Sequence, residues 1–168
     1  MPTRATKRLT LLRHAKASVA TAAQPDRDRP LNERGEHDAP LMGRRLKHSG
    51  ARPSLMLTSP AVRAMQTARL LAREIGYPLE FLQREADLYL AAPHDILAVL
   101  TRQDDTFNDI LVCGHNPGLT DLVNELTEAR LDNLPTCGIA TIEAPIATWR
   151  ELEQGGKLVY LDFPKKAR

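Results

Sequence analysis

The stretch Leu9-Thr10-Leu11-Leu12-Arg13-His14 places an arginine and a histidine directly after a short apolar run. A run of this length, without alternation of polar residues, is typical of a parallel strand that is buried on both faces. We therefore expect a strand over residues 9–12, with Arg13 and His14 at its carboxyl end. A guanidinium can hold two phosphoryl oxygens in a bidentate fork, and a neutral imidazole can attack phosphorus. The stretch predicts a corner of the fold that handles phosphate.

Two further apolar runs lead into residues of the same kind. Residues 55–58 run into a segment that carries Arg63, and residues 110–113 run into Gly114-His115. Ligands of open α/β sheets bind outside the carboxyl ends of the strands. The two arginines and two histidines that follow these three runs therefore predict one site.

A helix is expected directly after the second run. Ser59 and Pro60 are interpreted as its N-cap and first residue, and Gly76 as its stop. Apolar residues recur between them at helical spacing: Val62, Met65, Ala68, Leu71 and Ile75. Arg63 is thus expected in the first turn, at the positive end of the helix dipole, where a phosphate is stabilised.

The remaining chain completes an alternation of strands and helices. Residues 15–30 are expected to form a long irregular loop. Asn32 should cap the next helix, in which Pro40 causes a kink or a restart capped by Asp38. A helix with an apolar face formed by Leu119, Leu122, Val123 and Leu126 is expected after Asn116-Pro117, which repeats the capping residue followed by proline. Strands are expected near 79–82, 138–143 and 158–163, and a short helix over about 94–100. This alternation predicts an α/β sandwich.

Three motifs in this order resemble the histidine phosphatase superfamily, whose fold is called phosphoglycerate-mutase-like. They are Leu12-Arg13-His14-Ala15, then Ser59-Pro60 through Arg63-Ala64-x-Gln66-Thr67-Ala68, and finally Gly114-His115. Within this superfamily the chain is most similar to the small SixA-type phosphohistidine phosphatases. It shares with them Arg29-Pro30-Leu31 and the Gly-His-Asn-Pro sequence of residues 114–117. The resemblance runs from about residue 9 to residue 163.

The resemblance implies a three-layer α/β/α sandwich with a mostly parallel central sheet, in a single domain that spans residues 1–168. Residues 1–8 are expected to be a flexible basic tail. Larger members of the superfamily insert a helical cap between the arginine motif and the last histidine. Here only residues 64–114 separate the two motifs, so we expect an open site.

The resemblance also implies a metal-independent phosphatase that uses no cofactor. His14 is the expected nucleophile, and it would form a phosphohistidine intermediate. Arg13 and Arg63 would neutralise the phosphoryl group and the charge on its equatorial oxygens in the transition state. His115 would donate a hydrogen bond to a phosphoryl oxygen, as an imidazolium stabilised by the phosphate charge.

Three further assignments depend on position alone. Superfamily members commonly protonate the leaving group with a carboxylate after the third strand, and Asp87 lines up best with that place. SixA-type members often lack this acid, and phosphohistidine tolerates its absence because a protonated imidazole is a competent leaving group. A helix-capping or solvated role for Asp87 therefore stays open. Lys16 and Asn116 are expected to contact the phosphate.

Composition excludes several other functions. A net charge of +2 and an aromatic content of 4% provide no platform for nucleic acid. The sequence has neither an apolar stretch as long as a membrane span nor a signal peptide, which predicts a cytoplasmic protein. The two cysteines form no disulfide framework, and Cys113 is expected to be a buried, inert thiol. The spacing of the histidines and cysteines supports no metal site, and we expect His37, His48 and His94 at the surface.

The substrate that the resemblance implies is phosphohistidine on a partner protein, such as a histidine phosphotransfer domain. The alternative within the same class is a phosphatase of small phosphate esters. The alternative from another class is a non-catalytic module that binds phosphorylated proteins.

Overall fold

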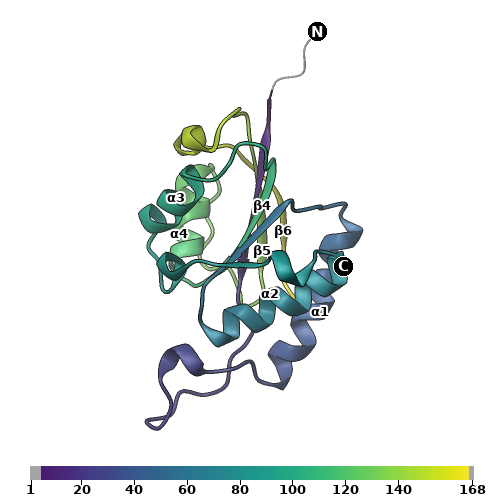
Figure 1. The fold of residues 1–168 in the computed structure, drawn as a ribbon, viewed down its shortest axis with the longest axis vertical. Coiled ribbons are helices and arrows are strands. Elements are labelled where there is room, and N and C mark those ends of the chain that lie inside the picture. Colours follow the sequence, from purple (N-terminus) through teal and green to yellow (C-terminus); the bar gives the residue numbers. More distant parts are fainter. Residues whose placement is uncertain (1–4, 167–168) are drawn as a thin grey trace.

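A six-stranded sheet forms the centre of the computed structural model, which describes residues 5–166 (Figure 1). The strands are β1 (Lys7–Arg13), β2 (Leu55–Thr58), β3 (Gln83–Arg84), β4 (Asp109–Gly114), β5 (Ile139–Ala144) and β6 (Lys157–Asp162). Their order in the sheet is β3-β2-β4-β1-β5-β6. The strands β3, β2, β4 and β1 are parallel, whereas β5 and β6 pair antiparallel with their neighbours. The prediction of a mostly parallel sheet is confirmed.

Helices cover both faces of this sheet. The pair α1 (Glu33–His48) and α2 (Val62–Ile75) lies on one face, and the pair α3 (Pro93–Thr101) and α4 (Gly118–Leu126) lies on the other (Figure 1). Short 3₁₀ turns connect the elements: η1 (Asp26–Asp28), η2 (Leu79–Phe81), η3 (Ala86–Leu88) and η4 (Trp149–Gln154). This is the predicted three-layer α/β/α sandwich. No helix within residues 5–166 is long and apolar enough to span a membrane.

The apolar side chains of the parallel strands fill two separate cores. In β1, Leu9 and Leu11 belong to the core beneath α3 and α4, and Leu12 belongs to the core beneath α1 and α2. Successive side chains of a strand point to opposite faces of its sheet, so an uninterrupted apolar run supplies both cores. This explains why the run that precedes Arg13 contains no charged residue.

The strand register places the functional residues at one edge of the sheet. Parallel pairing sets Arg13 of β1 opposite Gly114 of β4, and Thr58 of β2 opposite Cys113 of β4. The chain therefore leaves all three strands at the same edge, as the sequence predicts. His14 and His115 directly follow β1 and β4.

One prediction about local structure is wrong, and one alternative of a second is excluded. Residues 79–82 were expected to form a strand, but the carbonyl of Pro78 accepts a hydrogen bond from the Phe81 N–H and bends the chain into η2. Of the two alternatives expected at Pro40, a restart capped by Asp38 is excluded, because α1 continues through Pro40 without a break. The other alternative, a kink, stays a prediction. The burial of Met42 and the other apolar residues of α1 against α2 outweighs the hydrogen bond that Pro40 cannot make.

The expected N-cap is found at one of three helices, α1, and at α2 and α4 the helix begins later than expected. Asn32 caps α1 as predicted, since its side chain accepts a hydrogen bond from the Gly35 N–H. Ser59 was expected to cap α2, but Ala61 occupies that position. The helix α4 begins only after Pro117, and the Asn116 side chain accepts instead from the N–H of Thr120.

Lys7 and Arg8, which were expected in a flexible basic tail, belong to β1. The Lys7 side chain is buried, and its Nζ donates to the carbonyls of Asp105 and Phe107 at 2.7 and 3.2 Å. It also lies 5.4 Å from the centre of the Trp149 ring. The charge of Lys7 suggested a solvated residue, but acceptors from residues distant in sequence hold its side chain in place. Residues 1–4 of the expected tail lie outside the described part of the chain.

Gly35, in the first turn of α1, packs against the start of the loop over residues 15–30. A Cβ at this position would lie 2.2 Å from the Lys16 carbonyl oxygen. The same carbonyl accepts a hydrogen bond of 3.0 Å from the Asn32 N–H. The absence of a side chain at Gly35 therefore allows the loop to lie against the amino end of α1.

We expect Gly35→Ala to lower the free energy of unfolding by about 1–3 kcal/mol, the usual cost of forcing an extra methyl group into a packed position. Urea denaturation would measure the loss. Gly114→Ala is the matched control, because its Cβ would meet its nearest neighbour, a Leu119 methyl carbon, at 3.7 Å. Equal losses in the two variants would contradict the role given to Gly35.

Candidate active site

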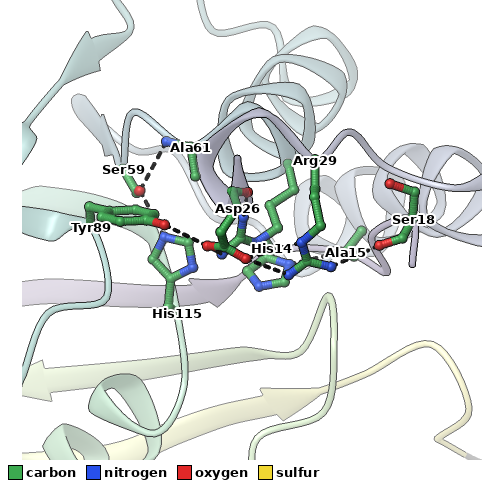
Figure 2. Close-up of polar contacts among 10 residues, drawn as sticks. His14, Ala15, Ser18, Asp26, Arg29, Ser59, Ala61, Tyr89 and His115 are labelled. Atoms are coloured by element: carbon green, nitrogen blue, oxygen red, sulfur yellow. Dashed lines mark hydrogen bonds and ion pairs between the residues drawn. The ribbon is translucent and has the colours of Figure 1, made fainter. Parts of the chain in front are cut away.

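The two predicted histidines lie side by side at the edge of the sheet. His14 follows β1 and His115 follows β4, and their ring centres are 5.2 Å apart (Figure 2). Arg63 comes from the second residue of α2, so it lies in the first turn as expected. The register of β1 and β4 and the start of α2 thus bring together the residues that the three motifs supply.

Of the two ring nitrogens of His14, Nδ1 takes part in a hydrogen bond with a described residue and Nε2 does not. Its Nδ1 lies 2.8 Å from the carbonyl oxygen of Ala15. Because a carbonyl can only accept, Nδ1 carries the hydrogen, and Nε2 of the neutral ring presents a lone pair. Burial, together with the charges of Arg63 and Arg13, lowers the pKa of His14 to about 4. The imidazole is therefore neutral near pH 7, as a nucleophile requires.

His115 is held by the residue that was expected to cap α2. Its Nε2 lies 2.8 Å from the Ser59 hydroxyl oxygen, and that oxygen accepts a hydrogen bond from the Ala61 N–H at 3.2 Å. The hydroxyl hydrogen is then available for Nε2, which favours a tautomer with the ring hydrogen on Nδ1. Burial, followed by the neighbouring His14, lowers the pKa of His115 to about 3. The ring is neutral in this state; the expected imidazolium depends on the charge of a phosphate and stays a prediction.

Arg13 is fixed by the segment that precedes β5. Its Nη1 donates to the carbonyl of Leu134 at 2.9 Å. The Asn116 amide donates to the same carbonyl at 2.9 Å and to the Asn133 side chain at 2.8 Å. The carbonyl oxygen of the Asn116 side chain accepts from Thr120. Asn116 therefore positions the neighbour of Arg13, and its polar atoms are occupied within the protein.

Arg63 is bound to the loop over residues 15–30. Its Nη1 donates to the backbone carbonyl of Asp26 at 2.8 Å, and its Nη2 to the Asp26 carboxylate at 3.0 Å. The side chain of Arg63 is only 3% exposed, whereas that of Asp26 is 45% exposed. Both terminal nitrogens of the predicted phosphate-binding arginine thus face one acidic residue.

The Asp26 carboxylate has two further partners. One oxygen accepts from Nε and Nη2 of Arg29 at 3.0 and 2.9 Å, and the other accepts from the Tyr89 hydroxyl at 2.5 Å (Figure 2). The Tyr89 hydroxyl, followed by the two arginines, holds the pKa of Asp26 well below its usual range. Tyr89 also sets its ring edge-on to His115 at 5.5 Å between centres. Asp26 is therefore a carboxylate ion within the site.

The helix α2 holds both ends of the loop that carries Asp26. The Thr67 hydroxyl oxygen accepts from the Ala15 N–H at 2.9 Å and donates to the Arg63 carbonyl at 2.7 Å. The Gln66 side chain accepts from the Leu31 N–H at 2.8 Å. The glutamine and threonine of the second motif therefore anchor the loop.

Three buried side-chain nitrogens of the site have no hydrogen-bond partner. They are Nε of Arg13, Nε of Arg63 and Nδ1 of His115. Leaving a buried donor without an acceptor costs free energy, so each such group calls for an explanation. An anionic ligand with several acceptor oxygens would supply what these donors lack.

Lys16 and Asp87 make no hydrogen bond or ion pair with the residues of this cluster. Lys16 is exposed, and its ammonium group makes none of the polar contacts found among the described residues. Asp87 lies in η3 with its side chain 68% exposed, and its charged partner is Arg102 at 3.8 Å. Neither side chain has a hydrogen bond or ion pair with His14 or His115, so their functional roles stay predictions.

Sequence reasoning missed Asp26, Tyr89 and Ser59. Asp26 lies in the irregular loop, where no periodicity predicts the direction of a side chain. Its position three residues before Arg29 was the one available signal, because Arg29 belongs to a motif shared with the SixA-type proteins.

The described residues include no group of three or more histidine, cysteine, aspartate or glutamate side chains that could hold a metal ion. Cys113 is buried as predicted, and burial raises the pKa of its thiol to about 12. His37, His48 and His94 are exposed, which confirms their assignment to the surface. The cations of the site are its arginines.

The pKa of His14 gives a test of the site in solution. The unfolded chain takes up a proton on this residue near pH 6.5, whereas the folded chain does so near pH 4. Acidification from pH 7 to pH 4 should therefore reduce the free energy of unfolding, because the unfolded state binds the proton first. Side-chain NMR should show a neutral His14 ring at pH 5.5, with the hydrogen on Nδ1. An imidazolium at that pH would contradict the environment described above.

Comparison with known proteins identifies the family. Residues 9–88 match the model of the histidine phosphatase superfamily, branch 1. An uncharacterized protein of Mycobacterium tuberculosis is 32% identical over 154 residues, which are 86% of this chain and 93% of that protein. An uncharacterized chloroplastic protein of Arabidopsis thaliana is 30% identical over 155 residues, which cover 86% of this chain and 70% of that protein.

Two solved structures show the same fold. One is described as a candidate phosphohistidine phosphatase, SixA, from Agrobacterium tumefaciens. It superposes with a TM-score of 0.81 at 26% identity, over 94% of this chain and 98% of its own. The other is the protein histidine phosphatase SixA complexed with tungstate, with a TM-score of 0.78 at 24% identity, over 93% and 96% of the two chains. The chain belongs to branch 1 of the histidine phosphatase superfamily.

Proposed function

We propose that this protein is a phosphatase that uses His14 as its nucleophile and removes the phosphoryl group from phosphohistidine on a partner protein. The observation that carries the proposal is the state of His14. Its Nδ1 is bound to the Ala15 carbonyl and its pKa is about 4, so Nε2 has a free lone pair at neutral pH. The charges of Arg63 and Arg13 act on this ring, and the His115 ring lies 5.2 Å from it between centres. These three neighbours carry buried nitrogens that lack acceptors among the described residues.

The reaction consists of two transfers of the phosphoryl group. Nε2 of His14 attacks phosphorus, a P–N bond forms, and the bond from phosphorus to the leaving group breaks. Water then attacks the phosphohistidine and releases inorganic phosphate, which restores the neutral ring. Arg13, Arg63 and His115 donate to the equatorial oxygens and stabilise the charge that they carry in the transition state.

Phosphohistidine suits this site because its leaving group can be protonated before it departs. An alkyl phosphate expels a poor alkoxide and needs a proton donor in the transition state. Asp87, the carboxylate that the family pattern places in that role, is exposed and faces Arg102. The likeness to structures described as SixA phosphohistidine phosphatases supports the same substrate class. A substrate carried on a protein also fits the expected open site.

Turnover should place a phosphoryl group on His14. Acid quenching would destroy this species, so we expect an acid-labile, base-stable label after a rapid alkaline quench of the wild type. The label should be absent from His14→Ala and present in His37→Ala, which removes an exposed histidine elsewhere. The same measurement with EDTA present tests the metal-free mechanism. Label on another residue, or a requirement for a divalent ion, would overturn the proposal.

Asp87→Asn separates the two substrate classes. Because Asp87 is exposed and paired with Arg102, we expect kcat/KM for phosphohistidine protein and p-nitrophenyl phosphate to change little. Wild-type cleavage of alkyl phosphates should be poor for lack of a proton donor. A selective loss on alkyl phosphates of about 10²- to 10⁴-fold, the range of general acid catalysis, would instead identify Asp87 as an acid and favour small esters.

A further inference from the structure

The resting site already contains an anion, and it belongs to the protein. Asp26 accepts from both terminal nitrogens of Arg63, which is 3% exposed. Asp26 thus takes two of the five N–H donors of this guanidinium. Binding of a phosphoryl group through those two donors therefore requires that it displace Asp26.

The contacts of the carboxylate resemble those that a phosphoryl group would need. Its two oxygens accept from three side chains: Arg63, Arg29 and Tyr89. Its negative charge acts on His115, whose pKa it raises against the larger effect of burial. Figure 2 shows the carboxylate between Tyr89 and Arg29, over the two histidine rings. A simple surface ion pair would have no such set of donors around it.

The loop can release this carboxylate without losing its anchors. Its ends are held by Thr67 and Gln66, and a hydrogen bond of 2.8 Å joins the Ser18 N–H to the Pro30 carbonyl. Residues 19–28 between these anchors are exposed. The contacts of that exposed part with the rest of the site include those of Asp26 and the Arg27 guanidinium, 4.9 Å from the Tyr89 ring centre.

We propose that Asp26 is a specificity-determining residue whose carboxylate occupies the position of the transferred phosphoryl group until a substrate displaces it. This inference rests on the proposed function, because it takes Arg63 to be the ligand of that group. The displacement selects for charge and shape. A phosphoryl dianion offers three oxygens and up to two charges, whereas a carboxylate offers two oxygens and one charge. Carboxylate metabolites therefore gain nothing by the exchange.

The energetic consequence is a measurable reduction in affinity. When the binding-competent state is a fraction of the population, the observed Kd is the intrinsic Kd divided by that fraction. Removal of the competing carboxylate should therefore tighten the binding of any phosphoryl-like anion. A residue that only supports the loop would have the opposite effect, because its loss would disorder the site and weaken binding.

The test is calorimetric titration of inorganic phosphate into the wild type and three variants. If Asp26 holds Arg63 in about 90–99% of the molecules, Asp26→Asn should lower the Kd by about 10- to 100-fold. Tyr89→Phe removes one partner of the carboxylate without changing any charge, and its Kd should change less than that of Asp26→Asn, because a phosphoryl group in the same place would lose the same hydroxyl. Asp28→Asn removes a charge from the same exposed turn, and it should leave the Kd nearly unchanged.

Three results would overturn the proposal. An unchanged or weaker Kd in Asp26→Asn, with an unchanged unfolding midpoint, would show that the carboxylate does not compete. Equal tightening in Asp26→Asn and Asp28→Asn would reduce the effect to net charge. A larger tightening in Tyr89→Phe than in Asp26→Asn would show that the tyrosine hydroxyl, and not the carboxylate, obstructs the phosphate.

This titration needs no turnover, so it separates the proposal from the phosphatase activity. Failure to trap a phosphoryl group on His14 would refute the proposed function, whatever the phosphate affinities are. Normal trapping together with an unaltered phosphate Kd in Asp26→Asn would refute the role of Asp26 alone. A slower cleavage confined to alkyl phosphates, with the Kd unaltered, would make Asp26 a proton donor and would also refute it as a competitor.

Discussion

The parallel pairing of β1 with β4, which sets Arg13 opposite Gly114, is the constraint on which the rest of the site depends. It brings His14 and His115 out of neighbouring strands with their ring centres 5.2 Å apart. A shift of one residue in either strand would turn its side chains to the opposite face of the sheet. The apolar residues before Arg13 prevent such a shift, because they fill the cores on both faces. The packing of two cores thus fixes the distance between two imidazoles.

The burial that fixes these rings also determines their charge. Taking an imidazole out of water disfavours its protonated form, and neighbouring guanidinium groups act in the same direction. His14 and His115 therefore stay neutral. Arginine suits this arrangement because its high pKa survives burial, whereas a lysine in the same place could lose its proton. The structure thus places neutral imidazoles beside guanidinium groups, the combination that the proposed phosphoryl transfer requires.

The sequence predicts those features of the site that depend on neighbouring residues in the chain, and it misses those that depend on residues far apart in it. Strand ends, the first turn of α2 and the left-handed stop at Gly76 depend on neighbouring residues, and the patterns that predict them are short. Asp26 meets Arg63 across 37 positions and Tyr89 across 63, from a loop without periodicity. Ser59 was predicted to be a helix cap because the proline that follows it fits one. Its hydroxyl instead forms a hydrogen bond with His115, which follows a different strand. Contacts of this kind exist only after the strands have paired.

The second motif shows how one helix serves two opposing purposes. Its first turn supplies Arg63, and its next turn supplies Thr67, whose hydroxyl joins the Arg63 carbonyl to the Ala15 N–H beside the nucleophile. Gln66 fixes the far end of the same loop through Leu31. The helix that supplies Arg63 therefore also anchors the loop whose carboxylate binds that arginine. Because the anchors are neutral hydrogen bonds at the ends of the loop, the ionic contact in its middle can open while the loop keeps its place. The spacing of Arg63, Gln66 and Thr67 along little more than one turn of α2 places the arginine and the anchors of the loop on the same element.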